Sequence, residues 1–436
     1  MRSFRRAGSA RTPEPGDGAT SDARAPQPGD GSMPDTRGPA RAPRAKLPRD
    51  VLVLGIIAFF VMVGFGVVVP VLPVYARSFG VGSFEIGAVI SAFALMRLVM
   101  SPFVARIMDW TGERTVLAIG LAIVALSSGL AGLAQDYLQL LLLRGAGGIG
   151  SAMFSVAAMT LLLGSTDPTR RARAIGFYQG GFLIGGMAGP ALGAVLATVS
   201  LTAPFFFYAA TLAVASVIGL LLLSKRTGSA DATGPAEPPR PFAEVLRDTR
   251  YRGALLANLG NGWASMGVRS SLIPLLVVEV IRAPAASTGI AFACAAVVQA
   301  LALAPAARFV DTVGRRPAII GSFAVAGVLM VAIPFAPNVV VLTILLCLFG
   351  AAASFMGTAP GAAVGDAAGG RSGRPVAVFS MVSDLGAIVG PLVAGYLADA
   401  VSFPVAFATG AVLLLAASAY ALLRMPRDER ITAPAA

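Results

Sequence analysis

The chain has 436 residues, of which 56% are hydrophobic and 13% are charged, whereas soluble globular domains are about 25% charged. Together with a mean hydropathy of +0.77, this composition excludes a soluble enzyme, a disordered protein and a disulfide-rich secreted module. The net charge of +12 does not indicate nucleic-acid binding, because the basic residues lie at the ends of long apolar runs and form no single patch. The main solvent of this chain is therefore expected to be lipid.

Residue types that perform most enzyme chemistry are scarce. There is no histidine, and the two cysteines, Cys294 and Cys347, both lie inside apolar segments. We therefore expect no metal site, no cofactor, no disulfide framework and no enzymatic activity. Residues 1–49 are polar and rich in Pro, Gly and Arg, without the apolar stretch of a cleavable signal peptide, and this predicts a disordered cytoplasmic tail.

Apolar runs of membrane-spanning length begin after this tail and recur until residue 424. A bilayer core about 30 Å thick requires about 20 apolar residues per helix. Twelve spans are expected, at 51–76, 84–107, 115–135, 138–163, 174–197, 203–224, 253–281, 287–309, 317–335, 338–362, 375–398 and 403–424. The fold class is therefore an all-α membrane protein. A polar cytoplasmic linker, 225–250, divides it into six-helix bundles at 50–224 and 251–424, and a cytoplasmic tail follows at 425–436.

The distribution of Lys and Arg supports this count and predicts an orientation. With the amino terminus inside, 29 of the 34 basic residues fall on inside segments, and only Arg77 and Arg282 fall on outside loops. Arg97, Arg144 and Arg269 remain within spans. Positive charge accumulates on the cytoplasmic side of membrane proteins. We expect a multi-pass protein of the cell (inner) membrane, with both termini cytoplasmic and the lipid bilayer as a partner.

The two groups of six spans resemble each other in sequence. The stretch from Ala105 to Arg114 matches the stretch from Ala307 to Arg316 at Ala, Arg, Asp, Gly and the final Arg, 202 residues later. Similar offsets of 201 or 202 align Gly87 with Gly289, Arg97 with Gln299, and Gly189-Pro190 with Gly390-Pro391. A duplicated six-helix unit is the simplest interpretation, and such parallel repeats form transporters that bind substrate between their halves.

Four motifs make residues 50–424 resemble the major facilitator superfamily. The loops after the second and eighth spans are similar to the family's GxxxDRxGRR signature at Asp109, Gly112, Arg114, Asp311, Gly314, Arg315 and Arg316. The fourth span reads RGAGGIGSA from Arg144, with Gly147 where the family usually has Gln. Gly64, Pro70 and Pro73 in the first span, and Gly185, Gly189, Pro190 and Gly193 in the fifth, resemble motifs of twelve-span drug:proton antiporters.

Each motif has a physical interpretation. The aspartates and arginines of the two loop signatures are expected to form a cytoplasmic latch, which joins the halves while the outside is open. A purely topogenic role for these charges is the alternative. Glycines in the fifth span permit close helix packing, and Pro190 removes a backbone hydrogen bond and can kink the helix. The resemblance further implies a monomer.

Charges inside the membrane carry the strongest functional signal, because each costs about 2.5–3.5 kcal/mol at the centre of a span. Arg97 and Asp384 lie at similar depth in the second and eleventh spans, which the family fold places side by side. We hypothesise that they pair in one conformation, and that protonation of Asp384 couples proton binding to rocking of the halves. A static structural pair is the alternative. For Arg144 the resemblance implies a role in proton movement, with helix packing or a substrate anion as alternatives.

Several polar side chains are candidates for a substrate cavity. They are Arg269, Asn258, Asn261 and Trp263 in the seventh span, Gln179 in the fifth and Gln299 in the eighth. Outward snorkelling is the alternative for Arg269, and hydrogen bonding between helices is the alternative for the other five. The aromatic run Phe205–Tyr208 is expected to be an interfacial belt, with a cluster that stacks on drugs as the alternative. Asp167 and Asp366 are expected to anchor helix ends, with participation in the cytoplasmic latch as the alternative.

Taken together, these features predict a secondary active transporter that works by alternating access. No nucleotide-binding GK[ST] ending follows the glycines of the fourth span. The resemblance implies a proton as coupling ion and proton-coupled efflux of drugs or small metabolites. Proton-coupled uptake or export of a nutrient, such as a sugar or an organic anion, is the alternative, since intramembrane arginines outnumber acids. A membrane-embedded enzyme and a transport-like receptor are the candidates from other classes.

Overall fold

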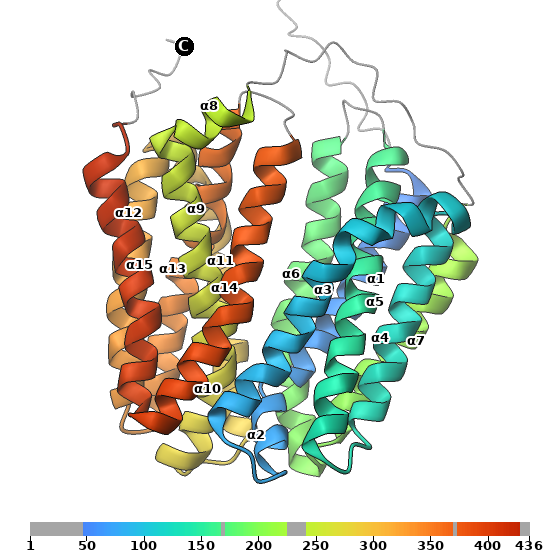
Figure 1. Ribbon diagram of the computed structural model, residues 1–436, viewed down its shortest axis with the longest axis horizontal. Coiled ribbons are helices and arrows are strands. Elements are labelled where there is room, and N and C mark those ends of the chain that lie inside the picture. Colours follow the sequence, from blue (N-terminus) through green and yellow to red (C-terminus); the bar gives the residue numbers. More distant parts are fainter. Residues whose placement is uncertain (1–46, 167–170, 225–240, 369–372, 428–436) are drawn as a thin grey trace, which may run out of the picture. The chain divides into compact units, whose positions relative to one another are not determined.

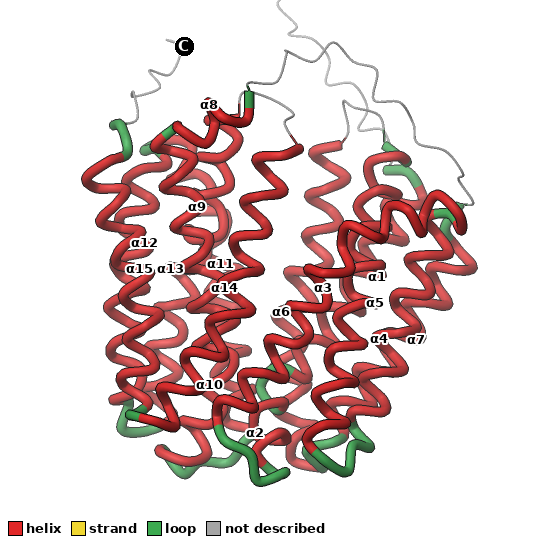
Figure 2. The backbone as a smooth tube through the Cα atoms, viewed as in Figure 1, coloured by secondary structure: helices red, strands yellow, loops and turns green. Residues whose placement is uncertain are grey.

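The computed structural model describes residues 47–166, 171–224, 241–368 and 373–427, and these parts are helical with connecting loops and no strand (Figure 2). Twelve helices are long and apolar enough to cross a membrane, which confirms the expected fold class. The spans of the N-terminal half are α1 (Arg49–Val68), α3 (Ser83–Thr111), α4 (Glu113–Ala131), α5 (Tyr137–Gly164), α6 (Arg171–Val199) and α7 (Ala203–Leu222) (Figure 1).

The C-terminal half contains the other six spans, and the first of them is not a uniform helix. It runs through α9 (Thr249–Gly262), the π-helical η2 (Trp263–Arg269), α10 (Ser270–Leu275) and the π-helical η3 (Leu276–Val280). The remaining spans are α11 (Ala286–Thr312), α12 (Arg315–Ala332, continued by the 3-10 turn η4, Ile333–Phe335), α13 (Val339–Ala368), α14 (Gly373–Ala400) and α15 (Phe403–Arg424).

Two segments differ from the expected boundaries. The first span ends at Val68, and after a turn the chain forms the short α2 (Leu72–Arg77), because the two prolines of this segment interrupt the helix and restart it. In the expected linker, Phe242–Arg247 forms α8, whose Val245 is buried against α9 and α13. The expected tail 1–49 lies outside the described residues up to 46, as do 225–240 of the linker and 428–436.

Equivalent contacts show that the halves share one packing plan. The hydroxyl of Ser216 donates to the carbonyl of Ala118 at 2.9 Å, and the hydroxyl of Ser418 donates to the carbonyl of Ile320 at 2.8 Å. Both residues of the second pair follow their counterparts by 202 positions. In each half, the serine hydroxyl therefore joins the last span to the third span by a hydrogen bond. The duplication seen in the sequence is thus present as a structural repeat.

The π-helical segments keep this repeat in register. In α1, Val63 and Gly66 pack on the glycine that precedes the proline of α6, whereas Trp263 and Gly267 pack on its counterpart in α14. The spacing is three residues in the first half and four in the second, so one extra residue lies within η2. A π-helix accommodates such an insertion without breaking the backbone hydrogen bonding. Within η3 the offset between the halves has grown from 200 at Val63 to 202 at Arg77, whose counterpart is Glu279.

The seam is the name used here for the interface between the two halves, where α3 packs on α14 and α6 packs on α11. Gly87 packs directly on the carbonyl of Pro391, and Gly289 packs on the carbonyl of Pro190. These two contacts are exchanged by the repeat, so a pseudo-twofold axis runs along the seam. Because a glycine leaves no Cβ between the backbones, the helices approach as closely as they can at both points.

The seam is closed at one end only. Figure 1 shows α3 and α14 converging toward the end that contains α2, termed the α2 end, opposite the α8 end. The backbone N–H of Phe84 donates to Asp399 at 2.9 Å, and the hydroxyl of Ser91 donates to the carbonyl of Ile388 at 2.6 Å. From Leu98 to Thr111, α3 makes no hydrogen bond or ion pair to any described residue of the other half. Among the described residues, no hydrogen bond or ion pair therefore holds the α8 end of α3 to the other half.

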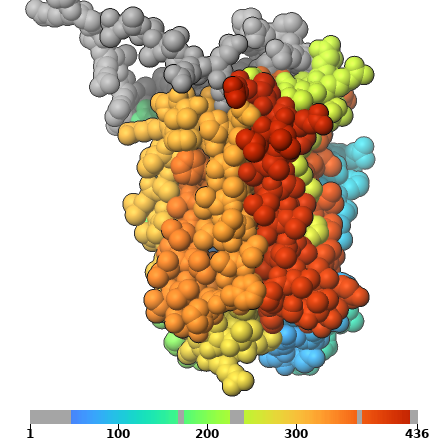
Figure 3. All heavy atoms as spheres, turned by 90° about the vertical axis from the view of Figure 1, so that its left-hand side faces the viewer, coloured from blue at the N-terminus to red at the C-terminus, as the bar shows by residue number. Residues whose placement is uncertain are grey.

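The outer surface of the C-terminal half is formed by residues of α12, α13 and α15 (Figure 3). Its exposed side chains include Val340, Ile344, Leu348, Val412 and Leu422. Such apolar side chains suit a hydrocarbon solvent, in which they lose nothing by being exposed. Several charged groups of the spans lie at the seam instead, and they are described next.

Candidate functional site

An ion pair crosses the seam at the point where contact between the halves ends. Nη2 of Arg97 in α3 contacts Oδ1 of Asp384 in α14, and the two side chains are 36% and 24% exposed. On the α2 side of the pair, Ala94, Ala387 and Ile388 form a small apolar cluster. The structure therefore brings together the two intramembrane charges that the sequence suggested as partners. Their effect on coupling stays a prediction.

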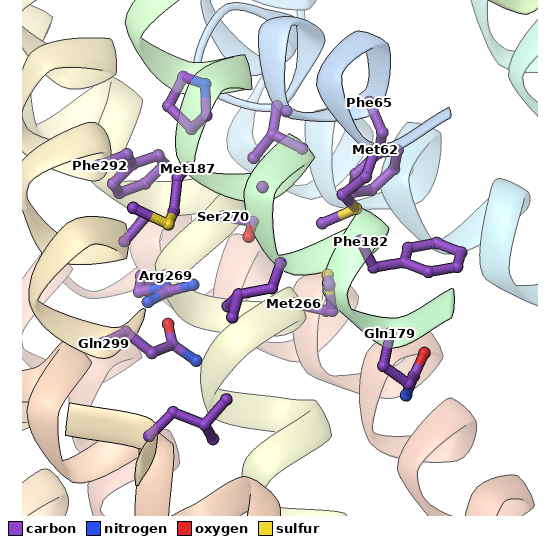
Figure 4. A pocket seen from close by; sticks show the side chains of 17 residues that line it. Met62, Phe65, Gln179, Phe182, Met187, Met266, Arg269, Ser270, Phe292 and Gln299 are labelled. Atoms are coloured by element: carbon purple, nitrogen blue, oxygen red, sulfur yellow. The ribbon is translucent and has the colours of Figure 1, made fainter. Parts of the chain in front are cut away.

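Two adjoining cavities lie between the halves and share the side chains of Met62, Phe65, Phe182 and Met266. One has a volume of about 430 Å³ and is termed the Arg269 compartment (Figure 4). The other, of about 240 Å³, is termed the Arg144 compartment. Most of the lining is apolar, as expected for a cavity that binds small molecules.

The Arg144 compartment is lined by two cations from the N-terminal half. Arg144 is only 6% exposed, its guanidinium lies 4.7 Å from the ring centre of Phe93, and its Nε has no hydrogen-bond partner. Arg97 and Tyr208 line the same cavity. The close approach of α3 and α5 that allows this stacking depends on Gly148, which packs on the carbonyl of Phe93. Sequence reasoning found Arg144 but not its aromatic partners.

The Arg269 compartment contains one cation from the C-terminal half. The guanidinium of Arg269 lies 5.7 Å from the ring centre of Phe292 and 5.6 Å from that of Phe349, and its Nε is buried without a partner. Gln179 and Gln299 line the same cavity, as expected. No Asp or Glu is among the residues that line either compartment. The site as a whole is thus positively charged within an apolar wall.

Three cavity candidates lie elsewhere in the C-terminal half. The amide of Asn258 donates to the carbonyl of Phe379 at 2.7 Å, and the indole of Trp263 donates to the hydroxyl of Thr409 at 3.1 Å. Oδ1 of Asn261 accepts from Ser265 at 3.1 Å. None of the three lines a compartment. The bonds of Asn258 and Trp263 join helices of one bundle, which was the alternative interpretation, whereas Asn261 bonds within its own span.

The aromatic run in α7 is not the interfacial belt that the sequence suggested. Phe205 and Tyr208 are 0% and 2% exposed, and Tyr208 lines the Arg144 compartment, while only Phe206 of the described set is strongly exposed, at 42%. The expectation was wrong because successive residues of a helix point in different directions around its axis. Four aromatic residues in a row therefore cannot all face lipid, and Phe205 and Tyr208 pack inside the protein.

The two loop signatures lie at the α8 end and do not join the halves here. Gly112 follows α3 with a φ angle of 81°, and Gly314 precedes α12 with a φ angle of 120°. Positive φ angles of this kind favour glycine, which explains why glycine occupies both turns. Asp109, Arg114 and Asp311 make no hydrogen bond or ion pair with the described residues. A latch through these side chains stays a prediction for a conformation in which this end is closed.

The second copy of the signature makes its bonds within its own half. Nε of Arg315 pairs with Oδ2 of Asp366 in α13 at 2.9 Å, and Arg316 donates to the carbonyls of Ala421 and Leu422 in α15. These contacts bundle three helix ends together. Asp366 therefore has a helix-anchoring partner, whereas Asp167 lies outside the described residues.

The glycines of the fifth-span motif form the contact between α6 and α1. Gly185 packs near the carbonyl of Phe59, and Gly189 lies against Gly66. A Cβ atom built on Gly193 would lie 2.6 Å from the carbonyl oxygen of Val67, so only glycine fits there. The following Pro190 is the residue on which Gly289 packs across the seam. The motif therefore serves two interfaces at once: one within its half and one between the halves.

Sequence reasoning missed a second ion pair across the seam, at the α2 end. Nε and Nη2 of Arg77 donate to Glu279 at 2.6 and 3.0 Å, and Nη1 of Arg77 donates to the carbonyl of Val81 at 2.8 Å. The hydrogen bond to Glu279 raises the pKa of Arg77, which outweighs the opposing effect of partial burial. Because Arg77 and Glu279 are counterparts in the repeat, the 202-residue offset could have identified them as facing residues on the pseudo-twofold axis.

Comparison with known proteins identifies the family of this chain. Residues 54–281 and 254–435 match the Major Facilitator Superfamily. The quinolone resistance protein NorA of Staphylococcus aureus is 28% identical over 175 residues, which are 40% of this chain and 45% of that protein. Multidrug resistance protein 1 of Bacillus subtilis is 29% identical over 165 residues, 38% of this chain and 42% of that protein. The alignments thus span less than half the length of these curated relatives.

Solved structures of transporters share the fold. An inward-facing, occupied structure of a bacterial homolog of the human lysosomal transporter Spinster superposes with a TM-score of 0.71 at 17% identity, over 86% of this chain and 95% of that one. The nucleoside transporter NupG superposes with a TM-score of 0.69 at 15% identity, over 86% and 98% of the two chains. The motifs, the twelve spans and the repeated halves agree with the sequence match, and the chain belongs to the Major Facilitator Superfamily as a membrane transporter rather than an enzyme.

Proposed function

We propose that this transporter is a secondary active exporter of drugs or small metabolites, driven by protons and working by alternating access. The observation that carries the proposal is the Arg97–Asp384 ion pair, which lies on the seam where contact between the halves ends. A titratable pair at such a position changes the attraction between the halves when it changes charge. The supporting cavity lies beside it, near the middle of the spans.

The orientation follows from the excess of basic residues on segments at the α8 end. On the positive-inside rule this end is cytoplasmic, together with both termini, and the membrane is the cell membrane. The α2 end is closed by the Arg77–Glu279 pair and by the glycine contacts of the seam. The structure then corresponds to the state that opens to the cytoplasm, and the loop signatures would close that end in the opposite state.

The coupling step proposed here is the protonation of Asp384. A proton on this carboxylate cancels its charge and leaves Arg97 without a counter-ion in a site that is only partly exposed. Removing one partner of a partly buried pair is unfavourable, so the halves rearrange until Arg97 finds water or another anion. Arg144 lies beside the pair, and its buried Nε has no hydrogen-bond partner among the described residues; through this arginine the change of charge acts on the cavity.

The export of drugs is supported by the printed names of the relatives, a quinolone resistance protein and a multidrug resistance protein. The wall of methionine and phenylalanine side chains in the compartments suits varied apolar compounds, because methionine adapts to different shapes. The second candidate is transport of a defined nutrient such as an organic anion. It is favoured by a cavity lining with three arginines and no acid.

The decisive experiment is transport by purified protein in liposomes with an imposed pH gradient and an internal pH probe, using ethidium as substrate. We expect Asp384→Asn to abolish the pH-driven flux and the accompanying proton movement while leaving facilitated equilibration intact. The matched control is Glu244→Gln, an exposed carboxylate of α8 outside the seam. Undiminished pH-driven flux by Asp384→Asn would refute the proposed coupling and leave Arg97–Asp384 as a static structural pair.

A further inference from the structure

The charge of Arg269 is unmatched within the described structure. Its Nε is fully buried without a partner, and its terminal nitrogens make no hydrogen bond or ion pair with the described residues, so they remain accessible to the compartment. The rings of Phe292 and Phe349 cover it at 5.7 and 5.6 Å. Aromatic faces attract a cation, but they satisfy none of its N–H donors. The donor edge of the guanidinium thus faces the compartment without a hydrogen-bond acceptor among the described residues.

The surroundings add a second donor and no competing acid. Figure 4 shows the amide of Gln299 and the guanidinium of Arg269 reaching into the same part of the cavity. The hydroxyl of Ser270, which also lines it, is already used, since it donates to the carbonyl of Ser265 at 2.8 Å. The intramembrane acid on the seam, Asp384, is paired with Arg97. No carboxylate of the lining therefore neutralises Arg269, and an anionic ligand would be its charge partner.

The repeat shows that packing does not require this charge. The counterpart of Arg269, 201 residues earlier, is Val68, which is 2% exposed, and the counterpart of Gln299 is Arg97. The N-terminal half thus builds the same helix contact with an aliphatic side chain. An arginine at this place costs free energy of insertion and gives nothing to the shared packing plan, so its use lies in the cavity.

We propose that the Arg269 compartment binds an organic anion, with its carboxylate or sulfonate on Arg269 and Gln299 and its apolar body among Met62, Phe65 and Met266. An arginine holds such an oxyanion through two parallel N–H donors, which gives orientation as well as affinity. The volume of about 430 Å³ accommodates a compound of two or three rings. This inference gives the exporter proposed above a subsite for the acidic group of anionic substrates, while compounds without an acid, such as ethidium, use the apolar wall alone; it rests on that proposed function.

Two fluorescent probes that differ only in the acid group test the inference. They are 8-anilinonaphthalene-1-sulfonate and N-phenyl-1-naphthylamine, titrated into the full-length protein in neutral-lipid nanodiscs, with empty nanodiscs as background. In the wild type we expect the sulfonate to bind at least about tenfold more tightly, as for a charged hydrogen bond that forms out of water. In Arg269→Gln this preference should vanish while binding of the neutral probe stays within about twofold. Arg269→Lys should retain part of it, because it keeps the charge without the fork.

The matched control is Arg424→Gln, which removes the same charge from an exposed position at the end of α15. It should leave both affinities unchanged. Equal binding of the two probes by the wild type overturns the inference without any variant, and so does an equal loss of both in Arg269→Gln. Proton-driven ethidium flux reports on the function separately. If that flux fails while sulfonate binding still depends on Arg269, the proposed function is wrong and the anion site stands; if flux persists without that dependence, the reverse holds.

Discussion

The two halves of the molecule share a packing plan but not their charges. Ser216 and Ser418 make the same interhelical hydrogen bond, and Gly87 and Gly289 make the same contact across the seam. The polar groups of the cavity do not follow the repeat. The residue of the N-terminal half that corresponds to Arg269 is Val68, and the one that corresponds to Gln299 is Arg97. Duplication thus preserved what holds helices together, while the residues able to act on substrate or protons diverged.

The two arginine–aromatic sites extend this comparison. Arg144 stacks on Phe93 in the N-terminal half, and Arg269 lies between Phe292 and Phe349 in the C-terminal half. Only the first shares its compartment with the titratable pair on the seam, through Arg97. We therefore propose that coupling acts through the Arg144 compartment and that substrate charge is recognised in the Arg269 compartment.

The strongest way to break the shared plan is to add a side chain where the halves meet. Gly289→Val and Gly87→Val place methyl groups against the carbonyls of Pro190 and Pro391, which cannot move without parting the helices. We expect either change to prevent closure of the α2 end and to reduce transport by about 100-fold or more, as severe overpacking does. Liposome flux and labelling of single cysteines at the α2 end measure this. Gly321→Val is the control, with nothing within 4 Å of its Cβ position; equal loss there would point to a general effect on the fold.

The division of labour between the arginines predicts a crossed pattern of losses. Arg144→Gln should lower pH-driven flux by at least about tenfold and leave the sulfonate preference in place, because one buried charge is removed beside the coupling pair. Arg269→Gln should abolish the sulfonate preference and leave the pH-driven flux of ethidium in place. Both variants are assayed for flux in liposomes and for probe binding in nanodiscs. Identical behaviour of the two variants in both assays would show that the halves do not divide these tasks.

The ion pair on the pseudo-twofold axis allows a charge exchange between counterparts. Arg77→Glu opposes two carboxylates, and we expect a shift of about two- to fivefold toward the state open at the α2 end, a modest value because both side chains are about 30% exposed. The double exchange Arg77→Glu with Glu279→Arg should restore the balance, as read by cysteine labelling at the α2 end. A double variant no better than the single one would mean that the contact is not what closes this end.

The same pair has a defined pH dependence. Because the pKa of Arg77 is raised in the structure, its contribution is complete below its ordinary value and is lost only as pH rises through the higher one. Both values lie above the range in which the protein is assayed, so Arg77 stays charged throughout. Any opening of the α2 end at low pH must then result from protonation of carboxylate side chains.

The smallest expected effect compares the repeated hydrogen bonds. Ser216→Ala and Ser418→Ala each free one buried carbonyl, and we expect each to lower the free energy of unfolding by about 0.6–1 kcal/mol. We expect the two variants to lose equal free energy of unfolding. Steric-trap or denaturant unfolding in micelles measures both losses. A difference of more than about 1 kcal/mol between them would show that the shared geometry does not imply shared energetics.

The sequence by itself determined the fold class, the twelve spans and the repeat, because apolar length, charge asymmetry and constant offsets are properties of the chain that lipid and duplication impose locally. It also singled out Arg97 and Asp384, since charges in hydrocarbon are conspicuous wherever they occur. Only the tertiary structure decided that Asn258 and Trp263 bond within one bundle. It likewise decided that Tyr208 faces the cavity and that two π-helical segments absorb the extra residues of the seventh span. Helix rotation sets which side of a span meets the seam, and in a span that is apolar all round no pattern of residues records that rotation.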